Sequence, residues 1–211
     1  MNSPTKAEPI NDTLFSWESW AGEVRINLIR LVALAIFYAH HLARVYLLKD
    51  APLDLSREIR IITLVISYGV LVAALYYVLR LGRLHPSIKY MVTAWDILMI
   101  GAIIVTMDGP RSVFSMLFLL PISASILRLS LPLVYFSTAL GALAYLAILA
   151  YYVWFVVGSE VYYSDSTVRI PRSEQVVVLF IILTAGLLAG QAVRQVRRII
   201  QSLRTAQSSQ S

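Results

Sequence analysis

Six long apolar segments, separated by short charged turns, occupy almost the whole chain of 211 residues. A helix needs roughly 20 apolar residues to cross about 30 Å of hydrocarbon, and segments of that length recur from Arg25 to Arg194. Charged residues make up only 14% of the chain, against about 25% in soluble domains. The sequence therefore predicts an all-α membrane protein, a bundle of six transmembrane helices in contact with the lipid bilayer.

Proline, glycine and charged residues between the segments set the approximate bounds of the six helices. A single proline, Pro121, lies inside the fourth segment, where it is expected to kink the helix and free a backbone carbonyl one turn earlier. The short connection after the fourth helix predicts that the fourth and fifth are antiparallel neighbours. The expected spans are residues 26–48, 58–79, 87–107, 112–129, 132–157 and 173–192.

The 18 Lys and Arg residues lie at helix ends, about eleven at one set of alternate ends and seven at the other. Under the positive-inside rule, this asymmetry and the even number of spans put both chain ends in the cytoplasm. Because the positive charges cluster at helix ends, they are expected to meet lipid phosphates, and no nucleic-acid partner is expected.

Three parts of the chain are expected: a polar interfacial arm over residues 1–24, a transmembrane domain over 25–193, and a basic cytoplasmic helix and tail over 194–211. Apolar residues at three- and four-residue spacing predict that the last helix continues past the membrane as an amphipathic stalk. Arg194, Arg197 and Arg198 are the candidates for passing helix motion to a partner through this stalk. The alternative is a helix that lies on anionic lipid through its arginines.

Asp96 lies near the middle of the third expected span, where an ionised carboxylate costs at least about 2.5 kcal/mol. It must be protonated, paired or hydrated. As a functional residue it would gate a proton, bind a cationic or hydroxylated ligand, or pair with an arginine of a neighbouring helix. As a structural residue it would hydrogen-bond a hydroxyl of a Ser, Thr or Tyr on another helix.

His40 and His41 lie near the far end of the first span. Their side chains point about 100° apart, so one helix cannot hold one metal with both, which argues against haem. An interfacial pair, a pH-responsive or quinone-contacting pair, and a pigment ligand remain as interpretations. The chain has no cysteine, which excludes thiolate metal sites and thiol redox switching.

A turn followed by aromatic residues forms the third candidate site, expected on the outer side of the membrane. Gly109 and Pro110 are expected to leave backbone donors free at a helix start, and Phe114 and Phe118 at i and i+4 to form one flat face before Pro121. A flat apolar ligand with carbonyl groups would suit this arrangement.

These same residues resemble a known family. The small-residue turn, Phe114, an apolar stretch ending in Leu120-Pro121 and Ile-Ser-Ala-Ser at 122–125 look like the region between the third and fourth helices of six-helix sensor domains in bacterial sensor histidine kinases, including quinone-binding, redox-responsive ones. The resemblance implies a multi-pass protein of the bacterial cytoplasmic (inner) membrane, a role in signal transduction, and quinone as a candidate ligand. This chain contains neither a phospho-accepting histidine segment nor an ATP-binding domain.

Enzyme signatures such as a phosphate-binding glycine loop, a nucleophile elbow or His-Glu-x-x-His do not occur, and no enzymatic activity is expected. The main hypothesis is a stand-alone sensor-type membrane domain that passes a membrane or ligand signal to a protein partner or to a second copy. The alternative is a structural or assembly subunit of a larger respiratory or photosynthetic membrane complex.

Overall fold

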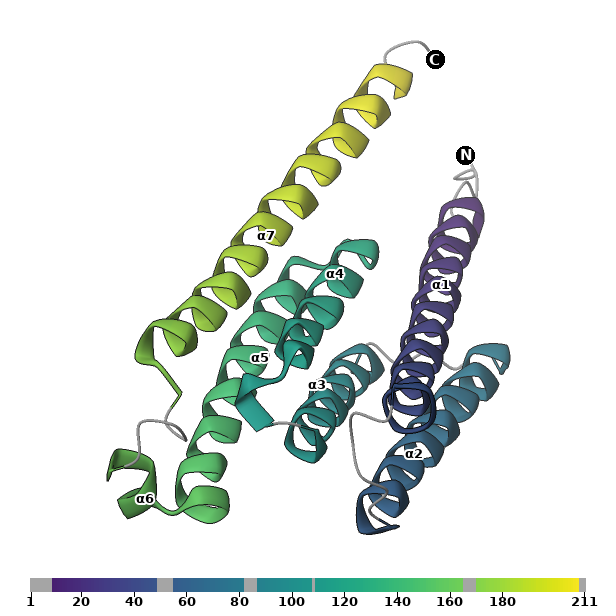
Figure 1. The fold of residues 1–211 in the computed structure, drawn as a ribbon. Coiled ribbons are helices and arrows are strands. Elements are labelled where there is room, and N and C mark those ends of the chain that lie inside the picture. Colours follow the sequence, from purple (N-terminus) through teal and green to yellow (C-terminus); the bar gives the residue numbers. More distant parts are fainter. Residues whose placement is uncertain (1–8, 49–54, 82–86, 108, 165–169, 209–211) are drawn as a thin grey trace, which may run out of the picture. The chain divides into compact units, whose positions relative to one another are not determined.

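The computed structural model describes residues 9–48, 55–81, 87–107, 109–164 and 170–208 (Figure 1). Helices make up 93% of it, and the described residues include no strand, which confirms the all-α prediction. The elements in chain order are α1 (Pro9–Leu42), the π-helix η1 (Ala43–Leu47), α2 (Leu55–Arg80), α3 (Ile88–Thr106), the 3-10 helices η2 (Gly109–Arg111) and η3 (Val113–Phe118), α4 (Leu119–Leu127), α5 (Leu131–Tyr151), the π-helix η4 (Tyr152–Val157), α6 (Ser159–Ser164) and α7 (Arg172–Ser208).

Among the residues that the structure describes, five helices are long and apolar enough to cross a membrane. Their spans are Gly22–Leu47, Leu55–Val78, Ile88–Thr106, Leu131–Val157 and Arg172–Leu203, and each covers one of the expected segments. The protein is thus a helical, multi-pass membrane type.

The fourth expected span differs from the continuous kinked helix that the sequence predicts. A 3-10 helix of six residues comes first, then α4 with nine residues, and the apolar helix over Phe114–Leu127 falls below the length of the other five. Pro121 lies in the first turn of α4, where the missing N–H leaves no helical hydrogen bond unmade. The proline therefore follows a change of helix type instead of kinking an α-helix.

The two ends of the chain are more helical than the division into three parts suggests. The helix α1 begins at Pro9, so most of the expected arm over 1–24 is continuous with the first span. At the other end α7 runs unbroken through 37 residues to Ser208, as the absence of a helix breaker predicts. At about 1.5 Å per residue α7 is roughly 55 Å long, well beyond the ~30 Å of hydrocarbon.

The chain divides into two compact units, Met1–Leu53 with Val65–Leu84 and Asp54–Leu64 with His85–Ser211. In the first unit the Asn27 side-chain amide on α1 donates to the Val72 carbonyl of α2 at 3.1 Å. Asn27 is buried, and its Oδ1 accepts no hydrogen bond from the described residues.

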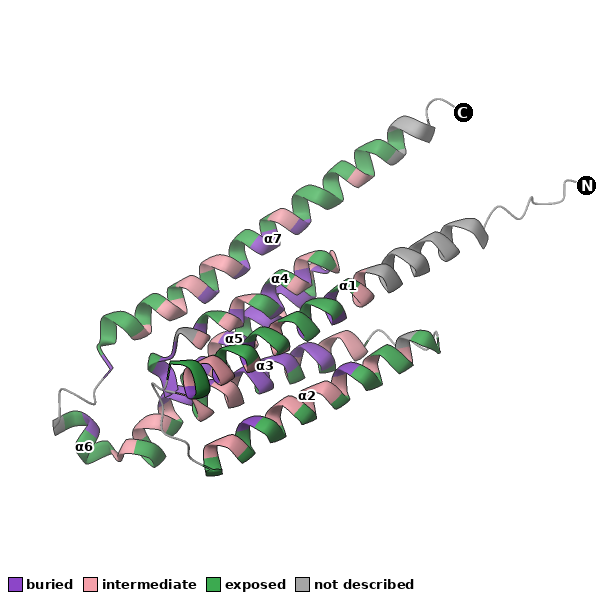
Figure 2. Ribbon diagram, turned by 45° about the vertical axis from the view of Figure 1, so that its right-hand side comes forward, coloured by how far each residue is buried: buried purple, intermediate pink, exposed green. Residues whose placement is uncertain are grey.

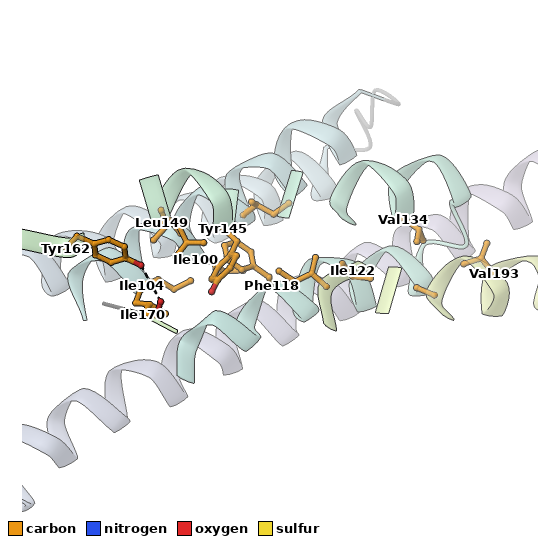
Figure 3. Packing of buried hydrophobic residues seen from close by; sticks show 14 residues of the cluster. Ile100, Ile104, Phe118, Ile122, Val134, Tyr145, Leu149, Tyr162, Ile170 and Val193 are labelled. Carbon is orange, nitrogen blue, oxygen red and sulfur yellow. Dashed lines mark hydrogen bonds between the residues drawn. The ribbon is translucent and has the colours of Figure 1, made fainter. Parts of the chain in front are cut away.

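The second unit holds the main core. It is centred on α5, which packs against α7 and α3, while α4 packs against both α5 and α7. Tyr145 and Phe118 are the largest fully buried side chains and lie among isoleucines of α3 and α7 (Figure 3). The opposite faces of the helices are exposed and apolar, which suits lipid contact (Figure 2).

Candidate functional site: the two ends of the second unit

The α4–α5 end of the second unit is where α3 and α5 begin and α4 ends. Leu129, just after α4, has φ +47°, a left-handed conformation that is most often adopted by glycine. Its carbonyl accepts two hydrogen bonds from the Arg197 guanidinium, from Nε at 3.0 Å and Nη2 at 2.7 Å. Such charge-assisted bonds are about twice as strong as neutral ones, so Arg197 stabilises this strained turn against α7.

A second arginine of α7 binds the same end. Arg194 Nη2 donates a short hydrogen bond to the hydroxyl of Tyr135 on α5. Gly190, one turn earlier on α7, lies beside the same side chain, and a Cβ there would be 3.4 Å from the Tyr135 hydroxyl, an ordinary contact. We call Arg128, Leu129, Tyr135, Arg194 and Arg197 the stalk junction.

Arg128 connects the stalk junction to α3. Its Nη1 donates to Thr93 Oγ1 at 3.1 Å, and the Thr93 hydroxyl donates to the Lys89 carbonyl at 2.7 Å. Asp96 lies one turn further along α3 and is buried, at 7% exposure. Because residues three apart share a helix face, Asp96 and Thr93 are on the same side of α3.

Between the two ends, a seam of buried hydroxyls joins α4, α5 and α7. Ser125 Oγ donates to the Pro121 carbonyl at 2.8 Å and lies 3.2 Å from Ser137 Oγ on α5. Next along α5, Thr138 faces Gly186 of α7 so closely that a Cβ at Gly186 would lie 2.8 Å from Thr138 Cβ, and closer to its Oγ1. Among the glycines of the described residues, Gly186 leaves the least room for a side chain.

The opposite end, the α6 end, is where α3 and α5 finish and α7 begins. It contains the predicted turn. Gly109 and Pro110 are buried there, and Gly109 has φ +66°. A Cβ at Gly109 would lie 3.1 Å from the Tyr152 ring of η4, so glycine is required both for the backbone and for this contact.

Two backbone donors of this turn, among those expected to be free, are used within it. Ser112 N–H donates to the Gly109 carbonyl at 3.0 Å, and Phe114 N–H donates to Ser112 Oγ at 3.2 Å. Ser112 thus acts as the N-cap of η3. These two donors are therefore taken by other residues of the turn itself.

Phe114 and Phe118 do not share the face that α-helical spacing predicts. They lie on a 3-10 helix with about three residues per turn, so positions four apart are rotated by roughly 120°. Burial follows that period, since Ser112, Ser115 and Phe118 are all buried. Phe118 is inside the core, and Phe114 packs against its edge.

The short helix α6 lies between the fifth and sixth expected spans. Its Tyr162 is buried at 4% exposure, while Tyr163 is 65% exposed. The Gln175 amide of α7 donates to both the Tyr162 hydroxyl and the Ile170 carbonyl at 3.0 Å (Figure 3 shows Tyr162 and Ile170). These bonds connect α6 to the start of α7.

His40 and His41 belong to the first unit and differ in surroundings. His41 is buried at 3% exposure, with its ring centroid 6.5 Å from that of Tyr38, and His40 is exposed. The described residues contain no group of three His, Cys, Asp or Glu side chains that could hold a metal ion.

Sequence reasoning missed three residues at the helix contacts: Thr138, Gly186 and Gly190. The signal was present for two of them, since Gly186 and Gly190 form a G-x-x-x-G pattern within an apolar helix, which is typical of close helix contacts in membranes. Leu129 could not have been found, because nothing in a leucine codes for a positive φ.

Comparisons with protein families, with characterised proteins and with solved structures gave no match to this chain.

Proposed function

We propose that this chain is a non-enzymatic sensor-type domain of the bacterial inner membrane that passes a change in helix packing to a protein partner through the end of α7. The observation that carries this proposal is the double attachment of the end of α4. Arg128 binds α3, and the neighbouring Leu129 carbonyl is held by Arg197 of α7. A shift of α4 would therefore move the base of the stalk relative to α3.

The stalk geometry favours transmission over a helix that lies on lipid. Arg194 and Arg197 hold α7 at the α4–α5 end, and the helix continues beyond them for about three turns to Ser208. Lying flat on the membrane would need a break after Arg197, and no glycine or proline follows it. The exposed Val196, Ile199 and Leu203 then form an apolar face for a protein partner.

The proposal includes six membrane crossings, with both chain ends in the cytoplasm. The length of the fourth segment is compatible with a sixth crossing. Six residues of 3-10 helix and nine of α-helix over 113–127 extend about 25 Å, a few Å short of the hydrocarbon thickness. Bilayers adapt to mismatches of this size at modest cost. A sixth crossing also keeps the Lys and Arg excess on one side.

Topology can be tested directly because the chain has no cysteine. Single cysteines at Ser3 and Ser209 should resist an impermeant thiol reagent in intact cells, and one at Ser164 should react. Labelling of only one terminus would show an odd number of crossings and overturn the six-span proposal.

The proposed input is the α6 end, where Phe114, on the 3-10 helix η3, is half-buried at the edge of the core. Runs of 3-10 helix longer than four residues are uncommon and often mark hinges. A flat ligand such as a quinone, which the family resemblance suggests, would shift α4 if it bound one helix packing more tightly by about 1–3 kcal/mol.

A spin label at Ser202, an exposed position on the stalk, tests the signalling route. In nanodiscs, adding a short-chain quinone should change the label's mobility. Phe114→Ala should abolish that change, whereas Met116→Ala, an exposed position on the same 3-10 helix, should preserve it. If the quinone has no effect in any variant, the structural-subunit alternative becomes the better one.

Substitutions of Asp96 test whether its carboxylate takes part in the response or is only structural. Asp96→Asn mimics the protonated form, so it should fold and keep its response if Asp96 is neutral and structural. Loss of the Ser202 signal in a folded Asp96→Asn protein would make the carboxylate part of the input. Retained folding and response in Asp96→Leu would exclude both roles.

A further inference from the structure

The α4–α5 end gathers positive charge from three separate elements. Lys89 at the start of α3 lies with its Nζ 5.4 Å from the centre of the Tyr90 ring. Tyr90 packs edge-on against Phe136 of α5, with ring centroids 5.3 Å apart. Arg128 follows α4, and Arg194 and Arg197 come from α7, so contacts already described connect all of these helices.

Acidic side chains are few at this end among the residues that the structure describes. In the second unit after α2, the described acidic residues are Asp96, Glu160 and Glu174. Glu160 and Glu174 lie at the α6 end, and Asp96 is buried one turn beyond Thr93 on α3. Among the described residues, the exposed charged side chains of the α4–α5 end are therefore basic.

Two of the guanidinium groups are already oriented. Arg197 uses Nε and Nη2 on the Leu129 carbonyl, and Arg194 uses Nη2 on the Tyr135 hydroxyl. Each guanidinium has five N–H donors, so both keep further donors on exposed side chains. Pre-oriented guanidinium groups match phosphate oxygens geometrically and lose little conformational entropy on binding.

The position of this surface indicates where the phosphate comes from. It lies at the beginning or end of apolar helices, beside Tyr90 and Tyr135, and tyrosines typically mark the headgroup level of a membrane. Met91 and Leu127, next in sequence to Tyr90 and Arg128, are 72% and 49% exposed and can contact acyl chains. A lipid would satisfy both the cations and these apolar side chains.

We infer that Lys89, Arg194 and Arg197 form a binding site for the phosphodiester headgroup of an anionic phospholipid. Basic clusters between transmembrane helices at a cytoplasmic face bind such headgroups in other proteins. The site stands whether or not α7 transmits a signal, because binding depends only on charge and geometry.

Native mass spectrometry of the purified protein measures this binding directly. Phosphatidylglycerol should bind more tightly than phosphatidylcholine, which has the same phosphodiester but no net charge. Lys89→Gln and Arg194→Gln should each weaken phosphatidylglycerol binding about fivefold, and the double variant about 25-fold. Arg172→Gln, with the same charge change at the α6 end, should leave the binding unchanged.

Tyr135→Phe serves as a variant that keeps all charges and removes only the hydroxyl that orients Arg194. It should weaken binding about two- to threefold while the helical content stays constant. Equal binding of the two lipids, or an equal loss in Arg172→Gln, would overturn the site. Displacement of the lipid by millimolar glycerol phosphate would replace it with a site for a soluble phosphate.

Discussion

The two ends of the second unit are built by different means. At the α4–α5 end regular α-helices meet, and arginine side chains donate hydrogen bonds from one helix to a backbone carbonyl or a hydroxyl of another. At the α6 end the same chain forms the 3-10 helix η3 and the π-helix η4, with glycines at φ +66° and +84°. The contact of Gly109 with the Tyr152 ring holds that end largely by packing.

This difference separates a rigid end from one that can rearrange. Hydrogen bonds to charged groups contribute about 1.5–3 kcal/mol each, whereas 3-10 and π segments have poorer hydrogen-bond geometry and can convert to α-helix at lower cost. A ligand or a lipid change would therefore act more easily on the α6 end. The end of α4 would move together with the base of the stalk, because Arg197 of α7 holds the Leu129 carbonyl.

Gly186→Ala should have the largest effect on stability and on the stalk, because the added methyl group would push α7 away from α5 midway between the two ends. The new methyl group would overlap the Thr138 side chain, and overpacking of this kind costs about 1–3 kcal/mol. We expect a lower free energy of unfolding in mixed-micelle titrations and a more mobile label at Ser202.

Gly101→Ala provides the matched control for that variant. Its methyl group would meet Ile148 at 3.5 Å, an ordinary contact, so the stability should stay the same or rise slightly. Equal behaviour of the two variants would mean that the α5–α7 crossing does not connect the ends.

Arg197→Gln tests the rigid end. Losing two hydrogen bonds to the Leu129 carbonyl should destabilise the protein by about 1–2 kcal/mol and release the stalk, so the Ser202 label becomes more mobile. Arg198→Gln removes the same charge from the neighbouring exposed position and should change neither quantity. A stalk label that stays equally ordered in both variants would contradict the stalk junction.

The rigid end and the overall fold were largely predictable from sequence. Apolar length and turn residues placed five of the spans, and helical spacing together with the absence of a breaker indicated that α7 would continue past the membrane. Arg194, Arg197 and Arg198 were the predicted transmission residues on charge alone, and the structure shows hydrogen bonds of Arg194 and Arg197 to other helices. Their partners, the Tyr135 hydroxyl and the Leu129 carbonyl, depend on tertiary contacts that a single sequence does not encode locally.

The α6 end was less predictable for a physical reason. A 3-10 helix and an α-helix bury residues at periods of 3.0 and 3.6, and the six residues of η3 make only about two turns, too few for a sequence pattern to tell the periods apart. The expected shared face of Phe114 and Phe118 followed from assuming the longer period. Asp96, a candidate because of its place in the third span, is buried, and its role stays a prediction.

Ser112→Ala tests the irregular end and should have a smaller effect than Arg197→Gln. The lost N-cap bond to the Phe114 N–H costs about 0.5–1 kcal/mol, typical of a neutral cap. Spin labels should show a change near η3 and little change at Ser202. A Ser202 change as large as that of Arg197→Gln would mean that the two ends are equally coupled to the stalk.

Pro121→Ala should have the smallest effect on the free energy of unfolding. It tests whether the proline interrupts a continuous helix or lies in the first turn of α4. A proline inside a continuous α-helix costs about 3 kcal/mol, so its removal from a kinked span would be strongly stabilising. In the first turn of α4 the missing N–H has no helical partner to lose, and the expected change in unfolding free energy is below about 1 kcal/mol. Pro132→Ala, in the first turn of α5 at the opposite end, is the matched control and should behave alike. If Pro121→Ala alone raised the free energy of unfolding by about 3 kcal/mol, the 3-10 segment and α4 would favour one continuous helix that the proline interrupts. The α6 end would then be strained and not adaptable.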